Sequence, residues 1–471
     1  MSAVTQTGAR DCGRLPLASG DPERVLVFGG ATGSVRLGRF LAQAQALAGG
    51  LPDARHALPL VEDRHGFLLA FCAAALRGQS LLLPPSGTPG TVAEILQAHA
   101  GTDAGAYCLG GTPPPLPAWH VPLPEPVDAA SCHDVPQVDA AALAAIGYTS
   151  GSTGRPQAHA KQWSAFARGT AQNVMALRDL WGDAQPQIVA TVPPQHMYGM
   201  ELSVLLPLLG GAAVHAGRPL LPADVARALE QAQGPRLLVT TPVHLRALLR
   251  SGVVLPPLAG IVSATAPLAS DLAAQAEARY GTQVREMFGS TETCILATRR
   301  TAQEAMWTPI PGVRLRPQPD GTQVQAPHLP AAVTLADLVE VAQDGRFRLC
   351  GRQADLLEIA GKRASLGDLT RRLLAVPGVE DGVVVQLEPE REGEVGRIAA
   401  LAVAPRLVAA QIVAALRGSV DPVFLPRRVR LLPALPRNDT GKLRRDLLLE
   451  LLADAPPVHS SAVADGDAGP A

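Results

Sequence analysis

Apolar residues along the chain gather into short runs that alternate with longer stretches of helical periodicity. The runs Val25–Phe28, Gln187–Val192 and Leu258–Ser263 are typical of buried strands, whereas Leu37–Leu47 and Ser270–Tyr280 have the spacing of amphipathic helices. Strands that alternate with helices in this way predict a parallel sheet covered by helices. Because such sheets bind ligands beyond the carboxyl ends of their strands, the loops that follow the strands are the candidate sites.

This alternation ends near Pro309, where short strands separated by turn signals such as Asp344-Gly345 begin. Beyond Arg352 a smaller set of helices and strands follows, and the last residues are poor in hydrophobic side chains. We therefore expect an α/β fold in three parts. They are a large domain over residues 1–352 with parallel sheets flanked by helices plus a β-subdomain, a small mobile α+β domain over 353–454, and a disordered tail over 455–471.

Composition narrows the class of protein. The 471 residues are 47% hydrophobic with a formal net charge of −1, which is typical of a globular protein and offers no basic surface for nucleic acid. The six cysteines are scattered without a C-x-x-C pair, so neither a zinc site nor a disulfide framework is indicated. No apolar run approaches the ~20 residues of a membrane span, and no signal peptide is evident. We expect a cytoplasmic protein with no membrane span and no nucleic-acid partner.

One loop dominates the search for chemistry. It follows the apolar run Ala141–Ile146 and reads Thr149-Ser150-Gly151-Ser152-Thr153-Gly154, with two glycines and four hydroxyl side chains in six residues. Glycines let the backbone approach a ligand, and N–H groups together with hydroxyls then bind an anion. A polyphosphate is the expected anion, although no Gly-Lys-Ser/Thr sequence closes the loop. Taken alone, a loop of this composition could equally be a flexible linker.

A second glycine-rich turn, Gly29–Gly33, lies between the strand Val25–Phe28 and the helix Leu37–Leu47. A dinucleotide-binding turn has this arrangement, but no acidic residue follows a second strand, so we prefer a hairpin turn before the first helix. The dinucleotide alternative makes the protein an NAD(P)-dependent oxidoreductase and predicts that Gly30→Asp removes cofactor binding. It leaves the loops described next unexplained.

Four loops in a fixed order resemble those of the adenylate-forming superfamily, which includes acyl-CoA synthetases, aryl-CoA ligases, adenylation domains and firefly luciferase. The loops are Thr149–Pro156, Phe288–Glu292, Gly351–Asp355 and Pro436–Lys442, and the resemblance extends from Arg24 to about Leu452. Members of this family activate a carboxylate with ATP to an acyl-adenylate, release pyrophosphate, and usually pass the acyl group to a thiol. The attack brings two anions together, so fixed donors and cations are needed.

The resemblance implies a role for particular nucleotide-binding residues. Phe288, with Gly289 beside it, would lie on the adenine, and both Asp337 and Arg352 would contact the ribose hydroxyls. The β- and γ-phosphates would be held by Thr149, Ser150, Gly151, Ser152, Thr153 and Gly154.

The resemblance also implies the residues that carry the reaction. Thr291 would donate its hydroxyl to the α-phosphate or the substrate carboxylate, and Glu292 would bind Mg²⁺, which prefers oxygen ligands. Lys442 would reach the reacting carboxylate and α-phosphate from the small domain. His196 would lie at the mouth of the acyl pocket.

Several of these assignments have simpler alternatives. Glu292 could be an acid that complements a helix N-terminus. Asp337, which lacks the glycine that precedes it in the family, could be an acid on a surface helix. Arg352 and Lys442 could be solvated charges, and His196 could be a polar cap on its loop.

The sequence departs from the family at two functional positions. Gln157 replaces the lysine that usually follows the phosphate loop, and Lys161 is the candidate substitute. Ala354 replaces the charged hinge residue about which the small domain is expected to rotate, although a hinge needs only to absorb a change in φ and ψ. The thioester-forming loop is recognisable at Ala360–Arg363.

The expected substrate is an aromatic or medium-chain carboxylic acid. Met197 occupies the place where amino-acid-activating relatives carry an aspartate, and a buried ammonium without a counter-charge would be costly. Met200 and Leu202 indicate an apolar pocket. Lys161 and Trp163 make the loop similar to that of acyl-AMP ligases from bacterial aryl-polyene and xanthomonadin-type pigment clusters, which favours a hydroxybenzoate-like acid.

We therefore expect an ATP-dependent acid–thiol ligase that uses ATP and Mg²⁺ and transfers the acyl group to CoA or to the phosphopantetheine of a carrier protein. Its partners would be a carboxylic acid substrate and an acyl carrier protein. Gln157 and Ala354 leave a non-catalytic, ligase-like binding protein as an alternative. Luciferase-like oxidation of the adenylate is a further alternative that the motifs leave open.

Overall fold

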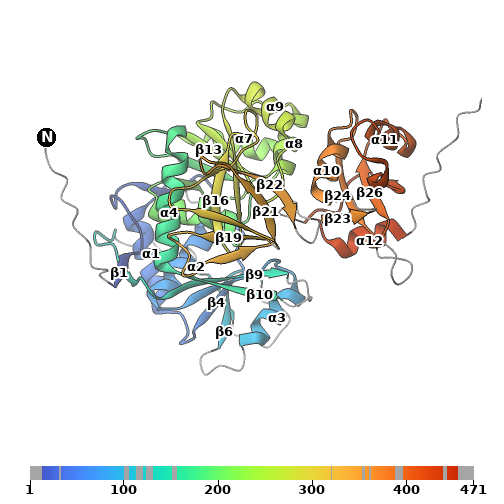
Figure 1. The fold of residues 1–471 in the computed structure, drawn as a ribbon. Coiled ribbons are helices and arrows are strands. Elements are labelled where there is room, and N and C mark those ends of the chain that lie inside the picture. Colours follow the sequence, from blue (N-terminus) through green and yellow to red (C-terminus); the bar gives the residue numbers. More distant parts are fainter. Residues whose placement is uncertain are drawn as a thin grey trace, which may run out of the picture. The chain divides into compact units, whose positions relative to one another are not determined.

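The computed structural model describes eleven stretches of the chain, shown in Figure 1, and no structural statement below concerns the residues outside them. They are residues 13–30, 33–99, 105–112, 120–123, 131–150, 156–319, 321–352, 356–359, 362–387, 396–438 and 443–453. The chain forms two compact units, of which the first comprises residues 1–314, 324–333 and 343–346 and the second the remainder. The domain boundaries expected from the sequence stay a prediction.

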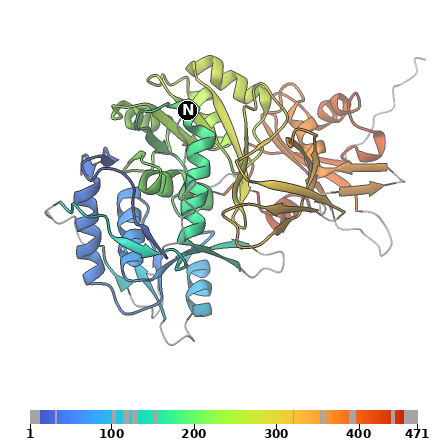
Figure 2. The ribbon, with the colours of Figure 1, turned by 60° about the vertical axis from the view of Figure 1, so that its left-hand side comes forward.

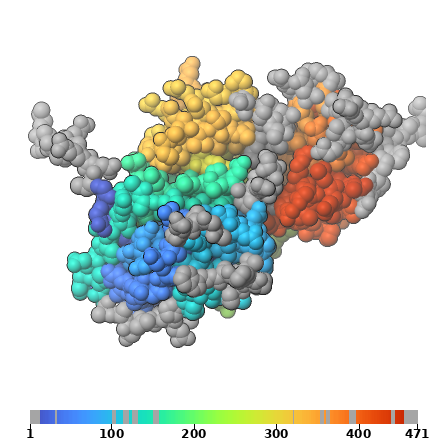
Figure 3. Space-filling model, turned by 90° about the horizontal axis from the view of Figure 1, so that it is seen from below, coloured from blue at the N-terminus to red at the C-terminus, as the bar shows by residue number. Residues whose placement is uncertain are grey.

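The first unit contains a six-stranded sheet in the order β10-β9-β5-β4-β6-β7. Its strands pair in parallel except for β9 and β10, which form an antiparallel hairpin at one edge. Figure 3 shows a face of this unit on which residues of this sheet and its helices, in blue to cyan, lie at the surface. The strands are β4 (His56–Pro59), β5 (Ser80–Leu83), β6 (Ala106–Leu109), β7 (His120–Val121), β9 (Leu143–Ser150) and β10 (Pro156–Gln162).

The same unit contains a nine-stranded sheet in the order β17-β16-β15-β14-β13-β11-β12-β2-β3. The strands from β2 to β15 pair in parallel, and antiparallel strands close both edges. A separate pair joins β1 (Arg14–Pro16) to β8 (Gln137–Asp139). The nine strands are β2 (Val25–Phe28), β3 (Val35–Arg36), β11 (Gln187–Ala190), β12 (Ala213–His215), β13 (Arg236–Thr240), β14 (Gly260–Ser263), β15 (Val284–Ser290), β16 (Cys294–Arg299) and β17 (Thr308–Pro309).

Helices cover the strands of both sheets. The long helix α4 contacts β10 of the first sheet and β16 of the second, and Figure 2 shows it in green as an upright element of this unit. The π-helix η2 (Glu201–Leu205) lies between α5 and α6. The helices are α1 (Leu37–Gly49), α2 (Arg64–Leu76), α3 (Pro89–His99), α4 (Trp163–Leu177), α5 (Met197–Met200), α6 (Leu206–Leu209), α7 (Pro222–Glu230), α8 (Pro242–Ser251) and α9 (Ser270–Tyr280).

Helix α2 is buried on every side, as its apolar composition requires. It begins with Arg64, whose side chain is fully buried and donates to the backbone carbonyls of Val192 and Gly217. These carbonyls lie just beyond the ends of β11 and β12 in the nine-stranded sheet, whereas α2 contacts β4 and β5 of the six-stranded sheet. Burial lowers the pKa of Arg64 to about 9. A single guanidinium thus connects the two sheets.

The glycine-rich turn Gly29–Gly33 belongs to an antiparallel hairpin. β2 pairs with β3 through Val25 with Arg36 and Val27 with Val35, and α1 begins only after β3. Gly29 and Gly30 have φ values of 71° and 72°, a backbone conformation that favours glycine. The hairpin interpretation is therefore confirmed, and the strand–turn–helix geometry of a dinucleotide-binding turn is absent from the described residues here.

The second unit contains short antiparallel strands followed by a helix-covered sheet of three strands in the order β25-β26-β27. Its core is aliphatic and includes Leu369, Leu373 and Ile412 from the helices α10 and α11. The elements from residue 314 onward are β18 (Arg314–Gln318), β19 (Gly321–Gln325), β20 (Val333–Leu335), β21 (Asp337–Val341), β22 (Phe347–Arg352), β23 (Leu356–Ile359), β24 (Lys362–Ser365), α10 (Leu366–Leu374), β25 (Asp381–Gln386), β26 (Ile398–Val403), α11 (Ala409–Leu416), β27 (Arg428–Leu431) and α12 (Arg445–Ala453).

The prediction of an α/β fold with parallel sheets flanked by helices is confirmed, while the mobility expected of the small domain stays a prediction. Two strands of the structure were not among the sequence predictions. β10 follows the phosphate loop as a strand, and β15 continues through Ser290 into a hairpin with β16. Within the described residues, none of the helices combines the length and apolar character that crossing a bilayer requires.

Candidate active site

The predicted phosphate loop is the turn of the β9–β10 hairpin. Ser150 on β9 and Pro156 on β10 are paired across the antiparallel ladder. Thr149 is half-buried on β9, and its hydroxyl lies 3.1 Å from Nε2 of His159 on β10. The remaining predicted phosphate ligands, Gly151, Ser152, Thr153 and Gly154, lie outside the described residues.

Thr291 and Glu292 lie at the tip of the β15–β16 hairpin. The hydroxyls of Ser290 and Thr293 lie 3.0 Å apart and each accepts a hydrogen bond from the other residue's backbone N–H, which closes the turn. A Cβ on Gly289 would lie 2.1 Å from the carbonyl oxygen of Cys294, so this position requires glycine. Because the strand β16 follows, Glu292 does not complement a helix N-terminus, and that alternative is wrong.

The Glu292 carboxylate is partly exposed and faces His159. Its Oε1 lies 3.7 Å from Nε2 of His159, and 35% of the Glu292 side chain is exposed. Burial acts to raise the pKa of Glu292, but the Ser290 hydroxyl and the His159 and Lys161 charges outweigh it, so the pKa is lowered. An ionised, accessible carboxylate fits Mg²⁺. Among the described residues no cluster of three metal-binding side chains is found.

Three long polar side chains alternate with alanines along β10 and therefore share one face of the strand. Gln157 is exposed, His159 is half-buried and Lys161 is 6% exposed, so burial deepens along the strand. The Lys161 ammonium donates a 2.6 Å hydrogen bond to the backbone carbonyl of Glu292. Lys161 thus does not stand in the place of the missing lysine at position 157, but supports the turn that carries Glu292.

A narrow crevice brings together residues predicted for the acyl pocket and the phosphate step. Thr291, His196 and Met197 line it together with Gly147. A Cβ on Gly147 would lie 2.8 Å from Cγ2 of Thr291 and 3.2 Å from Cε of Met197, so the close approach requires glycine. The crevice holds only about 10 Å³, roughly one water molecule, and side chains must move before an acid enters. The other lining residues are Leu83, Pro84, Pro85, Tyr148 and Gln195.

Phe288 and Gly289 form the last part of β15 before this turn. The Phe288 ring is half-buried and lies 5.6 Å, centroid to centroid, from the ring of Trp307. The guanidinium of Arg299 covers Trp307 at 4.3 Å from its ring centroid. Phe288 therefore presents an aromatic surface next to the Thr291 turn, as the predicted adenine contact requires.

The two predicted ribose-binding residues meet in the second unit. Asp337 opens β21 and pairs directly with Arg352 at the end of β22. The Asp337 carbonyl accepts a 2.6 Å hydrogen bond from the Thr322 hydroxyl, which fixes the backbone at the start of the strand. Asp337 lies on a strand rather than on a surface helix, so the helical alternative is wrong. Lys442 lies outside the described residues, as does Ala354.

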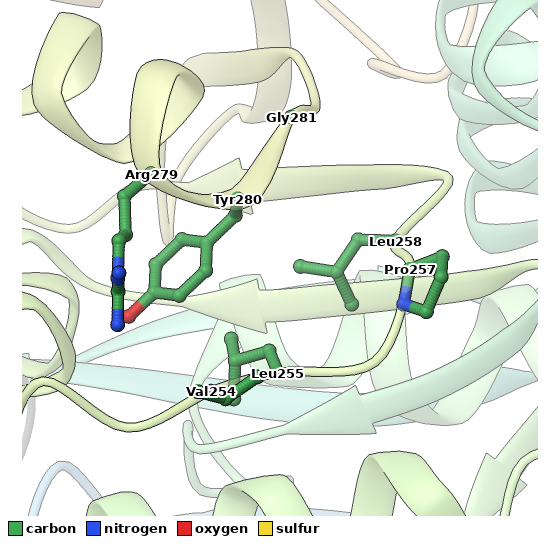
Figure 4. A pocket seen from close by; sticks show the side chains of 7 residues that line it. All are labelled: Val254, Leu255, Pro257, Leu258, Arg279, Tyr280 and Gly281. Carbon is green, nitrogen blue, oxygen red and sulfur yellow. The ribbon is translucent and has the colours of Figure 1, made fainter.

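Another pocket lies away from all of these residues. Figure 4 shows Tyr280 and Arg279 at the end of α9 facing the segment around Leu258, with space of about 290 Å³ between them. Leu258 precedes β14 and Gly281 precedes β15, so the pocket is at the amino ends of parallel strands. Ligands of such sheets bind at the opposite, carboxyl ends. We assign this pocket no part in the site.

Sequence reasoning missed four residues that support the site, namely Gly147, His159, Glu201 and His328. The alternation of Gln157, His159 and Lys161 with alanine on β10 would have indicated a strand with one polar face. Gly147 and the buried Glu201 carry no sequence signal, because their roles come from contacts with the β15–β16 hairpin. His328 is likewise recognised only from its contact with Thr293.

Comparison with known proteins identifies the class of enzyme and the protein family to which the chain belongs. The class is an AMP-forming acid–thiol ligase, as the sequence predicted. More particularly, the chain belongs to the AMP-binding enzyme family, whose model matches residues 67–326, more than half of the chain. It is 32% identical over 302 residues to a 4-coumarate–CoA ligase of Rhodobacter capsulatus, covering 64% of this chain and 74% of that protein. It is 25% identical over 350 residues to a 3-hydroxybenzoate–CoA/4-hydroxybenzoate–CoA ligase of Thauera aromatica, covering 65% of each.

The fold of this chain is similar to the folds of solved proteins. ATP-bound MatB from Rhodopseudomonas palustris superposes with a TM-score of 0.76 at 19% identity, over 92% of this chain and 97% of that one. O-succinylbenzoate coenzyme A synthetase (MenE) from Bacillus subtilis in complex with AMP also gives 0.76, at 17% identity over 92% and 98% of the two chains. At these identities the likeness concerns the fold alone.

Proposed function

We propose that the protein activates an aromatic carboxylic acid with ATP and transfers the resulting acyl group to CoA. The observation that supports this most is the meeting of two motifs that are far apart in the sequence. Glu292 lies 3.7 Å from His159 of the phosphate-loop hairpin, and Thr291 packs on Gly147 of the same hairpin. A polyphosphate held by the hairpin turn would therefore lie next to a hydroxyl donor and an ionised carboxylate.

In the first step, a carboxylate oxygen of the acid attacks the α-phosphorus of ATP. An O–P bond forms as the bond between the α-phosphorus and the pyrophosphate oxygen breaks, and pyrophosphate leaves. Thr291 donates its hydroxyl to the α-phosphate or the acid, and Lys442 neutralises charge that develops there. When bound, Mg²⁺ would be held by Glu292 and would neutralise phosphate charge.

In the second step, the sulfur of the acceptor thiol attacks the acyl carbon of the adenylate. A C–S bond forms, the C–O bond to AMP breaks, AMP leaves with the electron pair, and the thiol proton passes to solvent or to a base. The loop at Ala360–Arg363 would face this step. The named relatives use CoA, which favours CoA over a carrier protein as the acceptor.

The crevice residues favour an aromatic acid. Met197 is 6% exposed and its flexible thioether makes favourable contacts with aromatic rings, so it can move to admit one. His196 and Tyr148 add flat side chains to the lining. The crevice has no carboxylate that could pair with a substrate ammonium among its lining residues, which disfavours an amino acid.

The test is acid-dependent release of pyrophosphate in the presence of ATP and Mg²⁺. The acids are 4-hydroxybenzoate, 3-hydroxybenzoate, 4-coumarate, octanoate and phenylalanine, each without and with CoA. We expect release with a hydroxylated aryl acid and faster turnover with CoA, and Glu292→Gln as the inactive control. Release only with octanoate would contradict the aromatic substrate, and no acceleration by CoA would favour a carrier protein. If no acid releases pyrophosphate while ATP still binds in calorimetry, the protein is the non-catalytic alternative.

A further inference from the structure

The backbone of the turn that carries Thr291 and Glu292 is held by three side chains from outside the turn. The Lys161 ammonium donates to the carbonyl of Glu292 at 2.6 Å, and Nε2 of His328 lies 2.7 Å from the carbonyl of Thr293. Two residues further on, the N–H of Ile295 donates to both carboxylate oxygens of Glu201 at 3.1 Å. Three backbone groups of residues 292–295 are thus each held by a side chain from a different part of the chain.

These three side chains lie deep in the first unit. Lys161, Glu201 and His328 are 6%, 4% and 3% exposed. Neighbouring residues of α4 hold two of them: Asn173 donates to Glu201 at 3.2 Å, and Oε1 of Gln172 lies 2.6 Å from Nδ1 of His328. Burying a charge is costly unless polar partners compensate for lost water. Buried polar side chains therefore hold the turn in place, and their hydrogen bonds would be lost if the turn moved.

Lysine use in the chain singles out Lys161. Of 41 lysine and arginine residues, only Lys161, Lys362 and Lys442 are lysines. A sequence that otherwise uses arginine retains lysine where a planar guanidinium with five donors does not fit. Lys442 and Lys362 are the lysines of the two reactive loops, and Lys161 is the third. An ammonium in a buried slot beneath a single carbonyl is such a place.

We propose that Lys161 is a positioning residue for adenylate formation. Together with Glu201 it sets the placement of the 291–295 turn, and thereby aims the Thr291 hydroxyl and the Glu292 carboxylate at the nucleotide. Lys161 acts through the Glu292 carbonyl and does not touch the phosphates. This inference rests on the proposed function of Thr291 and Glu292.

The opposite charges of Lys161 and Glu201 allow a test that separates positioning from stability. Burial raises the pKa of Glu201 to about 7, and Lys161 is one of the groups that act to lower it, so removing Lys161 alone takes away a cation that stabilises the ionised carboxylate and would destabilise the fold. The double variant Lys161→Met/Glu201→Gln removes both charges, and Gln keeps an acceptor for Ile295. The double variant should therefore recover thermal stability but not the Glu292 carbonyl contact.

The variants to compare by steady-state pyrophosphate release and by thermal melting are the wild type, Lys161→Met, the double variant and Arg285→Met. Arg285 is the matched control, because it lies on β15 far from the turn and pairs with Asp179. We expect kcat for adenylate formation to fall about 100-fold in both Lys161 variants, as a misplacement near 1 Å can cause, with KM for ATP within a few-fold of wild type. We expect Arg285→Met to keep the wild-type kcat.

Two outcomes would overturn the inference while leaving the proposed function intact. One is a wild-type kcat in Lys161→Met, and the other is recovery of both melting temperature and kcat in the double variant, which would make the role of Lys161 purely structural. The wild type reports on the proposed function in the same assay. If it releases no pyrophosphate with any acid, the proposed function fails and the inference fails with it.

Discussion

Asp337 and Arg352 are direct partners across the antiparallel pair β21–β22, at the open end of the hairpin. Fourteen residues of hairpin between them close at the exposed turn that contains Asp344. Paired positions are the nearest neighbours across two strands, so one small ligand can contact both. This pairing places side by side the backbones of the two residues that the family resemblance implies for the ribose, and their role stays a prediction.

The first prediction tests Asp337. Asp337→Asn leaves one acceptor where the carboxylate has two, and we expect KM for ATP to rise about tenfold or more, as loss of a charged hydrogen bond implies. We also expect the variant to lose the wild-type preference for ATP over 2′-deoxyATP or 3′-deoxyATP in pyrophosphate release. Asp344→Asn, at the exposed turn of the same hairpin, is the control. An unchanged preference in Asp337→Asn would remove the residue from the ribose site.

The second prediction concerns Lys442. We expect Lys442→Ala to lower adenylate formation at least about 100-fold, because a cation no longer meets the charge that develops on the α-phosphate. ATP affinity by calorimetry should stay within a few-fold of wild type. Lys362→Ala is the comparison, since its loop is implied in thioester formation, and we expect it to keep the first half-reaction. Near-normal pyrophosphate release by Lys442→Ala would refute the assigned role.

The third prediction uses the contact between Gly147 and Thr291. A methyl group on residue 147 would lie 2.8 Å from Cγ2 of Thr291, so Gly147→Ala must displace the turn. We expect kcat for adenylate formation to fall about tenfold or more. Thr291→Ser removes Cγ2 but keeps the hydroxyl. The double variant Gly147→Ala/Thr291→Ser should therefore have most of the activity of the single variant Thr291→Ser. No recovery in the double variant would show that Gly147 acts through another contact, such as Met197.

The fourth prediction is a pH dependence of stability. Burial, with repulsion from His99 and Arg55, lowers the pKa of His56 to about 4. The unfolded chain has a histidine pKa of about 6.5, so between these values it binds more protons than the folded state, and the stability is lost as the pH falls. Urea unfolding at several pH values from 7.5 to about 4.5 should show a shallower decline in His56→Asn than in wild type. Equal slopes would contradict this assignment.

The sequence was sufficient to predict candidate loops for the chemistry, because these loops resemble those of the adenylate-forming superfamily, and their roles stay predictions. Thr291 and Glu292 were predicted from one motif, and Asp337 and Arg352 from two separate ones. The structure adds that Asp337 and Arg352 are direct neighbours across two strands, which neither motif alone could indicate. The hairpin at Gly29–Gly33 was preferred because no acidic residue follows a second strand, and the structure confirms it because a strand rather than a helix follows the turn.

The sequence was insufficient where a residue's role depends on distant contacts. Lys161 looked like a replacement phosphate ligand, because a lysine after a phosphate loop is usually solvated or on a ligand. Its burial is decided by the turn at Glu292, more than a hundred residues away, and local pattern carries no information about it. Glu201 attracted no prediction, and its buried carboxylate is explained only by its hydrogen bonds with the N–H of Ile295 and the side chain of Asn173.

The guanidinium of Arg64 has a consequence for how this part of the chain unfolds. It belongs to a helix of one sheet, yet its hydrogen bonds end on carbonyls at the strand ends of the other. If either sheet opened alone, a desolvated cation would lose its partners while still surrounded by protein, which is costly. The two sheets should therefore melt in a single cooperative transition, with no intermediate in which one sheet is folded and the other is not.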